Sequence, residues 1–543
     1  MKSTAKLPIT SDSTTLPIRR DTPYSPVITT RDGKVQGRRL INETDFKADA
    51  FLGVPFAQPP VGDLRFRKPV PPKKWSGIRE CFKQPKGSVQ IPDYLVDKNW
   101  PSSEDCLYLN VFCPADYSAK KYPVMVFIHG GAHAFGYAKE YGDQGICDGL
   151  VRQSVIVVTV QYRLGILGFF STGDDVCPGN FGLWDQLEAL KWVQENICYF
   201  GGDKNNVTLF GQCSGGVCAD LLWLSPYSRG LFHRLIPMSG NANSAWAHRK
   251  SSAGYCKAYA ATKLGITAKS SHELIEKLRI VPADQLKVEV FFKNIAWREN
   301  IRDFCPVIDG DLIPRPVEDL RRYAPAMPVM AGVTALESGL ALRPKDVTLK
   351  HLENTIEEML PKGSRKETRD ALFNLYKEVG KNRQPQEALW RARVELSSDR
   401  MYNIATVKLL KECSERGAPA YFYVFAYYNP ICIGRVANFA PSTEASHSCD
   451  LAYIFNAGVD AFFDFSDHDK QVAKVMTSAF ANFAKRGNPN DEGSYTWLPC
   501  DDKHPGRHMV LDVKPRFVEQ YNAGRCERWF EVMEKGKFAK SSL

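Results

Sequence analysis

The amino-acid sequence predicts an α/β fold in which helices cover both faces of a mostly parallel, twisted central sheet. Two runs, Tyr122–Ile128 and Val155–Val160, are apolar and short enough to be strands buried on both faces. Helical periodicity follows in Gly182–Val193. A strand, a tight glycine turn and an apolar helix then come in direct succession around Gly211–Gly215. Strands that alternate with helices in this way are typical of layered α/β folds.

The remaining elements continue this alternation along the chain. We expect a flexible tail over residues 1–26, a strand or hairpin over Val27–Gln36 and a strand with alternating side chains over Glu104–Phe112. Further strands are expected over Leu235–Gly240, Met327–Val333 and Ala420–Tyr428, and helices over Ser271–Ile280 and Val472–Lys485. Charged residues at helical spacing over 348–380 predict a helical lobe packed over the sheet and the site.

The chain shows no internal repeat and no linker long enough to divide it into independent domains. We therefore expect one domain over residues 27–535 and a short C-terminal tail over residues 536–543. With 543 residues and 44% hydrophobic content, a domain of this size can bury a large core.

Composition argues against several classes of function. The net charge of +10, from 71 basic and 61 acidic residues, is spread along the chain, so neither nucleic acid nor a membrane surface is an expected partner. No apolar run is long enough for a transmembrane helix or a signal peptide, and we expect an intracellular, cytoplasmic protein without stable membrane insertion. The 15 cysteines lack metal-ligand spacing, so reduced thiols, no metal and no other cofactor are expected.

The glycine turn matches a nucleophile elbow that carries a thiol in place of a hydroxyl. The elbow pattern is G-x-S-x-G, and the chain reads Gly211-Gln-Cys213-Ser-Gly215. An elbow holds its nucleophile in a strained backbone conformation, and side chains at the flanking positions would collide with the strand and the helix. Cys213 is therefore the candidate nucleophile.

Partners for Cys213 are expected in the order nucleophile, acid, histidine that α/β-hydrolases use. His447 is the best-placed histidine because it lies in a loop after an apolar strand and before a helix. Glu337 comes directly after the Met327–Val333 strand, where α/β sheets place functional groups, and would orient His447 and stabilise its imidazolium.

Two aspartates are alternatives to Glu337 as the acid. Asp309 lies in an Asp-Gly-Asp segment that is typical of a turn, and Asp399 is more typical of a supporting residue beside the site. Outside this context a loop glutamate is more often a solvated group, and a lone loop histidine is more often structural.

The loop after the Tyr122–Ile128 strand predicts an oxyanion hole. Such a hole needs backbone N–H groups directed at developing negative charge, so small residues in an exposed loop suit it. Gly130, Gly131 and Ala132 provide such donors, and Ser214, the residue after the nucleophile, provides another.

These segments together resemble the type B carboxylesterase and cholinesterase-like family of the α/β-hydrolase fold. The resemblance extends from about Val27 to Val532. It rests on segments that include AFLGVPFAQPPVGDLRFRKP, EDCLYLNVFCP, IHGGAHAFG, FGGDKNNVTLFGQCSGG, GVTALESG and HSCDLAYIF. Their length and spacing make the resemblance specific.

The resemblance implies a role for each candidate residue. It assigns the nucleophile, which is a serine in the family, to Cys213, the acid to Glu337, the base to His447 and the oxyanion donors to Gly131, Ala132 and Ser214. It also implies that Ser239 and Asp450 support the site and that Arg163 and Asp185 form a structural pair.

The sequence thus predicts a carboxylic ester hydrolase or acyl transferase that acts on small-molecule esters or thioesters through an acyl-enzyme intermediate at Cys213. A thiolate is more nucleophilic than a neutral hydroxyl, but sulfur is larger than oxygen, and a misplacement of about 1 Å costs on the order of a hundredfold in rate. The alternative is a catalytically weak or inactive pseudoesterase that binds a ligand or a partner and in which Cys213 fills space. Substrate identity and oligomeric state stay open.

Overall fold

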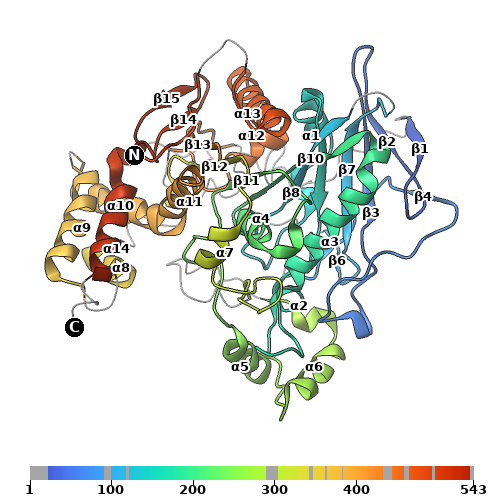
Figure 1. Ribbon diagram of the computed structural model, residues 1–543, viewed down its shortest axis with the longest axis horizontal. Helices are drawn as coiled ribbons and strands as arrows, with labels where there is room; N and C mark the ends of the chain where they lie inside the picture. The colour runs from blue at the N-terminus through green and yellow to red at the C-terminus, as the bar shows by residue number, and fades with distance from the viewer. Residues whose placement is uncertain are drawn as a thin grey trace, which may run out of the picture.

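The computed structural model describes ten ranges of the 543-residue chain. These ranges are residues 23–90, 100–117, 121–288, 304–340, 347–360, 364–381, 383–431, 443–457, 464–491 and 496–538. Figure 1 shows a large twisted sheet with helices on both of its faces and a separate group of helices to one side.

Within these ranges, a 13-stranded sheet forms the centre of the fold. Its order is β1-β2-β3-β7-β9-β8-β10-β11-β12-β13-β14-β15, and β4 pairs with β2. The strands are β1 (Tyr24–Thr29), β2 (Lys34–Asn42), β3 (Lys47–Pro55), β4 (Ile78–Glu80), β7 (Tyr108–Pro114), β8 (Tyr122–Ile128), β9 (Ile156–Val160), β10 (Gly202–Gln212), β11 (Arg234–Met238), β12 (Val329–Thr334), β13 (Ala420–Phe425), β14 (His508–Leu511) and β15 (Arg516–Val518). Strands β9 through β14 in this order are parallel. The outer strands pair antiparallel, except that β4 pairs parallel with β2.

Successive side chains of the parallel strands enter two different hydrophobic cores. In β8, Val124, Val126 and Ile128 belong to one core, whereas Met125 and Phe127 belong to the other. This division follows from the alternation of side chains along a strand. The predicted mostly parallel sheet with both faces covered is therefore confirmed.

Helices on the two faces supply the rest of each core. The first core receives side chains from α2 (Gly165–Phe169), α3 (Phe181–Asn196), α4 (Ser214–Leu224), α5 (Ala253–Lys263), α6 (Ser271–Arg279), α7 (Val317–Tyr323) and α11 (Ile404–Ser414). The second receives them from α1 (Gln144–Asp148), α12 (Leu451–Phe455) and α13 (Asp467–Arg486). The short strands β5 (Gly87–Ser88) and β6 (Ser102–Ser103) form a separate pair.

A lobe of four helices lies beside the sheet (Figure 1). It consists of α8 (Leu349–Met359), α9 (Lys366–Val379), α10 (Pro385–Ser398) and α14 (Arg525–Phe538), which share a small core of their own. The charged helical stretch predicted over residues 348–380 corresponds to α8 and α9. Helix α14 follows the other helices of the lobe by more than a hundred residues. No local sequence pattern predicted that it packs with them.

Several element boundaries differ from those expected. The predicted tail over residues 1–26 overlaps β1, which starts at Tyr24 because it pairs with β2. The helix expected from Val472 starts at Asp467, where Ser466 and Asp469 form a reciprocal capping box. The serine that caps α6 is Ser270, whose hydroxyl accepts a hydrogen bond from the Glu273 N–H at 3.2 Å. The division into one domain and two tails stays a prediction.

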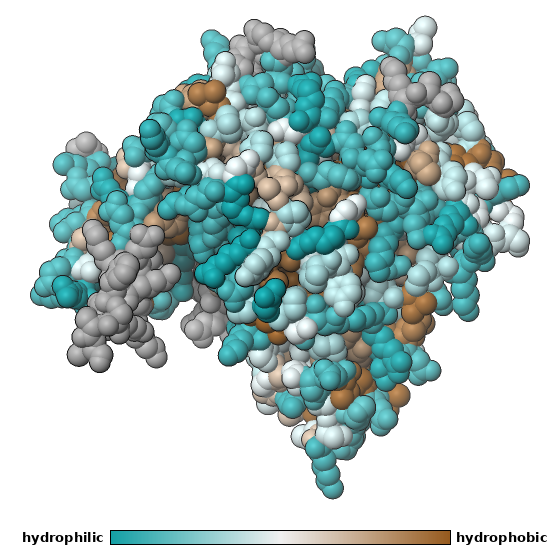
Figure 2. Space-filling view, in the orientation of Figure 1, coloured by the Kyte–Doolittle hydropathy of each residue, from teal (hydrophilic) through white to brown (hydrophobic). Residues whose placement is uncertain are grey.

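The surface is mostly polar. Hydrophilic side chains cover most of the face in Figure 2, and hydrophobic ones appear in small groups between them. That distribution is normal for a solvated protein surface. None of the helices in the described ranges has both the length and the apolar character needed to cross a membrane.

A buried ion pair holds α3 against the segment that follows β9. The Arg163 guanidinium donates to both carboxylate oxygens of Asp185, at 2.8 and 2.6 Å, and the Arg163 backbone N–H donates to the same carboxylate at 3.0 Å. Both side chains are buried. The pairing implied by the resemblance is therefore present.

Removal of Asp185 is expected to destabilise the fold strongly. In Asp185→Ala the Arg163 charge stays buried without its partner, which costs about 3–5 kcal/mol. The measurement is the denaturant midpoint of unfolding. Asp148→Asn is the matched control, because Asp148 forms an exposed ion pair with Arg152 and its loss should leave the midpoint almost unchanged. Equal midpoints for the two variants would contradict the prediction.

Candidate active site

The backbone at Cys213 has the conformation of a nucleophile elbow. Cys213 stands between β10 and α4 with φ 55° and ψ −123°, a region that residues other than glycine rarely adopt. The Cys213 N–H donates to the carbonyl of Met238 at 2.8 Å, and its own carbonyl accepts from the Val217 N–H at 3.1 Å. Strand β11 and helix α4 thus hold the strained residue from both sides.

The two glycines of the elbow are required by close backbone contacts. A Cβ atom on Gly215 would collide with the carbonyl oxygen of Ile128, and one on Gly211 would collide with the carbonyl of Gly215. These collisions are the ones expected from the sequence pattern.

Glu337 and His447 form a short charged contact. Glu337 begins the turn Glu337–Leu340 directly after β12, and its Oε2 lies 2.6 Å from Nδ1 of His447. Its other oxygen accepts from the Ser239 hydroxyl at 2.6 Å and from the Thr334 N–H at 2.7 Å. The carboxylate is fully buried, so these donors fix its position and compensate for the loss of water.

The His447 imidazole is held on several sides. The His447 N–H donates to the Glu337 carbonyl at 3.2 Å, and Tyr402 stacks on the ring with centroids 4.6 Å apart. Ala445 and Cys449, on either side of His447, are buried in the second core. Burial by itself lowers the pKa of His447, but the neighbouring Cys213 sulfur and Glu337 carboxylate more than offset it, and the pKa lies well above its usual value.

Gln212 is a site residue that the sequence did not single out. Its Nε2 lies 3.1 Å from Nε2 of His447 and donates to the Ser448 hydroxyl at 2.9 Å. The Gln212 amide N–H can donate to Nε2 of a neutral imidazole. In an imidazolium, Nε2 carries a proton and needs an acceptor, which a rotation of the amide group by about 180° would provide as its oxygen. The only sequence signal for this contact is the position of Gln212 directly before Cys213.

The predicted oxyanion donors are free to bind a ligand. The N–H groups of Gly131, Ala132 and Ser214 donate no hydrogen bond to any of the residues that the structure describes. Gly131 and Ala132 have φ angles of 106° and 53°, which turn the loop sharply after β8. Ser214 is the first residue of α4, where the helix dipole favours negative charge.

The oxyanion loop packs directly on the elbow. A Cβ atom on Gly130 would lie 2.8 Å from the carbonyl oxygen of Gln212 and 3.1 Å from Cβ of Cys213, so only glycine allows this approach without a backbone shift. The Ser214 hydroxyl accepts from the His133 N–H at 3.3 Å and ties the loop to the start of α4. The loop and the elbow therefore form one rigid unit.

Asp450 lies beside these residues but bonds to a different partner. Its Oδ2 accepts from the Tyr423 hydroxyl at 3.3 Å, and its Oδ1 has no hydrogen-bond partner within the described part of the chain. Burial, together with the charge of Glu337, raises the pKa of Asp450 to about 7. The implied support of the site by Asp450 stays a prediction.

The two alternative acids do not contact His447. Asp309 accepts from the side chain of Asn180 at 2.8 Å and from the N–H groups of Asp311 and Ile313, which is the turn role expected for it. Asp399 is bonded to Tyr376 of α9, to Asn403 four residues later and to Arg525 of α14. The support of the site that is expected from Asp399 stays a prediction.

Metal and disulfide chemistry are not apparent in the described ranges. No three His, Cys, Asp or Glu side chains there form a group that could hold a metal ion. Every cysteine in those ranges has a free thiol.

Comparison with known proteins gives consistent matches over nearly the whole chain. The model of a family described as the carboxylesterase family matches residues 24–529. Esterase cest-33 of Caenorhabditis elegans is 36% identical over 514 residues, which cover 91% of this chain and 92% of that protein. Fatty acyl-CoA hydrolase precursor, medium chain, of Anas platyrhynchos is 32% identical over 538 residues (94% and 93%), and cocaine esterase of Homo sapiens is 34% identical over 533 residues (94% and 92%).

The pKa of His447 is expected to fall when either neighbouring charge is removed. Glu337→Gln and Cys213→Ala each remove one of the groups that raise it, and in the double variant burial, which lowers the pKa, acts without them, so the pKa should drop well below that of the wild type. The measurement is an NMR titration of protein labelled in its histidines, with the resonances of His504 as an internal reference. A His447 pKa that is the same in wild type and in the double variant would contradict this account.

Proposed function

The chain belongs to the carboxylesterase family, and from that membership we propose that it hydrolyses small-molecule carboxylic esters and thioesters through an acyl intermediate on Cys213. The observation that carries the proposal is the 2.6 Å contact of Glu337 with His447, close to an elbow that presents Cys213 at a positive φ. A buried carboxylate that orients a histidine near a nucleophile is the arrangement of acyl-transfer enzymes.

The proposed first step forms the acyl-enzyme. His447 takes the thiol proton at Nε2, and the Cys213 sulfur attacks the carbonyl carbon of the substrate. The carbonyl oxygen becomes an oxyanion, which the free N–H groups of Gly131, Ala132 and Ser214 stabilise. The intermediate then collapses, and the bond to the leaving group breaks as His447 returns the proton to it.

The second step releases the acid. His447 removes a proton from water, whose oxygen attacks the thioester carbon of the acyl-Cys213. The oxyanion forms again in the same place, and the sulfur leaves and takes the proton back from His447. An acceptor alcohol in place of water would give acyl transfer by the same steps.

A sulfur nucleophile restricts the class of substrate. The tetrahedral intermediate expels its less basic group, and a thiolate is far less basic than an alkoxide. With an ester of a simple alcohol, the tetrahedral intermediate therefore expels mostly the Cys213 sulfur and returns to the starting ester. Forward reaction needs early protonation of the leaving oxygen by His447. Thioesters and esters of phenols leave more easily, so we propose them as the preferred substrates, and the similarity to a protein named as a fatty acyl-CoA hydrolase supports the thioester class.

Acylation of Cys213 is the direct test. After incubation with a p-nitrophenyl ester, mass spectrometry should find the acyl group on the peptide that contains Cys213. His447→Ala should lose the adduct because the thiol keeps its proton. If neither hydrolysis nor an adduct is found over a panel of acyl lengths and leaving groups, the proposal is wrong and the chain is an inactive, ligand-binding relative of the esterases.

The leaving-group preference should change in Cys213→Ser. A serine alkoxide is no better a leaving group than the alkoxide of the substrate, so the ratio of kcat/KM for a phenyl ester to that for an ethyl ester of the same acid should fall on the order of tenfold, about 1.4 kcal/mol in relative barriers. Activity toward the ethyl ester should rise. An unchanged ratio would argue that sulfur takes no part in the reaction.

A further inference from the structure

One helix of the lobe, α10, contacts both segments that carry the proposed acid and base. The N–H of Ser338, next to Glu337, donates to the Ser398 hydroxyl at 3.0 Å. Leu336, on the other side of Glu337, packs in a small cluster with Trp390 and Val394 of α10. Glu337 is thus anchored on both sides by the same helix.

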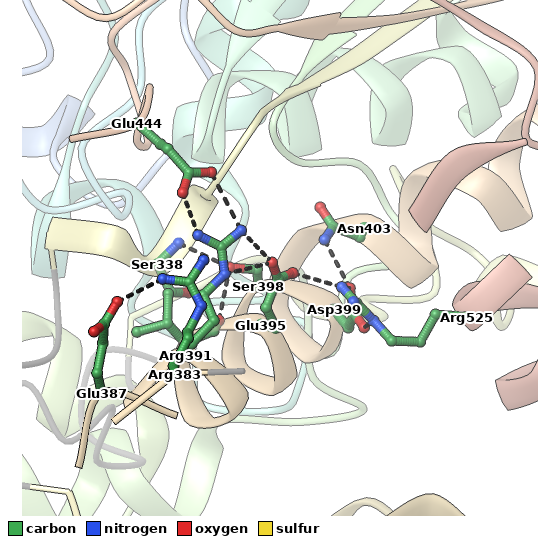
Figure 3. A network of polar contacts seen from close by, with 11 residues as sticks. Ser338, Arg383, Glu387, Arg391, Glu395, Ser398, Asp399, Asn403, Glu444 and Arg525 are labelled. Atoms are coloured by element: carbon green, nitrogen blue, oxygen red, sulfur yellow. Dashed lines mark hydrogen bonds and ion pairs between the residues drawn. The ribbon is translucent and has the colours of Figure 1, made fainter. Parts of the chain in front are cut away.

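The same helix holds the His447 loop through an ion pair. Arg391 of α10 meets Glu444, three residues before His447, in a two-point contact: Nη1 with Oε1, and Nη2 with Oε2 at 3.2 Å (Figure 3). The planar guanidinium fixes the direction as well as the distance of such a contact. Arg391 is only 13% exposed, whereas Glu444 is 40% exposed.

Between Glu444 and His447 the loop runs along the Glu337 segment. The Leu336 N–H donates to the Ala445 carbonyl at 2.9 Å, and the His447 N–H donates to the Glu337 carbonyl at 3.2 Å. These two backbone bonds leave the loop little freedom once Glu444 is fixed. A shift at Glu444 would therefore pass directly to the imidazole.

Arg391 is itself held by a chain of charges that reaches the C-terminal helix. Glu395 accepts from Arg391 at 2.6 and 3.0 Å and, through its other oxygen, from Arg525 of α14 at 2.6 Å. Arg525 also pairs with Asp399. The single π-helical turn Asp399–Asn403 contains Tyr402 as well, which stacks on His447.

We propose that Arg391 is a positioning residue: through Glu444 it holds the His447 loop against Glu337, so that the imidazole reaches both Cys213 and the leaving group. The inference rests on the proposed function of Cys213 and His447. Its expected signature is a loss in kcat with little change in KM, because the loop affects proton transfer more than substrate binding. A misplacement of about 1 Å costs on the order of a hundredfold in rate, so a partial shift should cost about tenfold.

The test compares Arg391→Met, Arg391→Lys and Glu444→Gln with a matched control at the start of the same helix. The control is Arg383→Met. Arg383 lies two residues before α10 and forms an exposed ion pair of 2.6 Å with Glu387 of α10 (Figure 3). The readouts are kcat and KM for a phenyl ester, the thermal midpoint, and the rate at which iodoacetamide alkylates Cys213, followed by mass spectrometry of its peptide.

We expect Arg391→Met and Glu444→Gln each to lower kcat about tenfold with KM within about twofold. The double variant should be no worse than either alone, because both substitutions break one contact. Arg391→Lys, which keeps the charge but loses the two-point contact, should be intermediate. Arg383→Met should match the wild type in every readout.

Two results would overturn the inference. One is a kcat and an alkylation rate in Glu444→Gln equal to those of Arg383→Met, since removal of a half-exposed carboxylate leaves the fold intact. The other is an equal loss of kcat in Arg383→Met, which would indicate a general weakening of α10.

Alkylation separates this inference from the proposed function. If the wild type hydrolyses no ester but Cys213 alkylation slows in Arg391→Met and not in Arg383→Met, the positioning role stands and the esterase proposal fails.

Discussion

The positive φ at Cys213 is the constraint on which the other features of the site depend. A backbone with that conformation turns back on itself, so the start of α4 comes within contact of β8 and of the loop that follows it. Gly130, Gly211 and Gly215 occur where this approach leaves no room for a Cβ atom. The hydrogen bond from Cys213 to Met238 anchors the turn to the neighbouring strand β11. A side chain at any of these glycines would open the turn and move Cys213 away from the N–H groups of Gly131, Ala132 and Ser214.

Near that turn the buried Glu337 carboxylate and the His447 imidazole each have defined partners. Glu337 receives two neutral donors on one oxygen and contacts His447 with the other, so both oxygens of this fully buried carboxylate are bonded. The result is a strongly basic histidine beside a thiol. This arrangement suits proton transfer from sulfur, whose acidity is much closer to that of imidazole than the acidity of a serine hydroxyl is. The thiol is thus better matched to this histidine than its unusual place in an elbow suggests.

The sequence predicted the features that depend on local pattern. The bounds of β8, the elbow around Cys213 and the loop residues Gly131 and Ala132 are visible because the apolar runs and glycines lie next to one another in the chain. Glu337 and His447 were found from their order and from the strands before them. Gln212, Arg391 and Glu444 were not found, because their roles come from contacts between segments 235 and 53 residues apart. Neither a glutamine before Cys213 nor an arginine on a charged helix has a local sequence pattern that indicates which residues its side chain contacts.

The long sequence separation between Arg525 and its carboxylate partners also affects the order in which parts of the fold can form during translation. Asp399 is synthesised 126 residues before Arg525, and Glu395 130 residues before it. At about 5–20 residues per second, Asp399 waits roughly 6–25 s for its cation during translation, whereas Glu395 already has Arg391. Carboxylates without a cation resist burial, so the lobe cannot close firmly over that interval. The lobe can therefore close firmly only after Arg525 has been made, long after β10 and α4 on either side of Cys213.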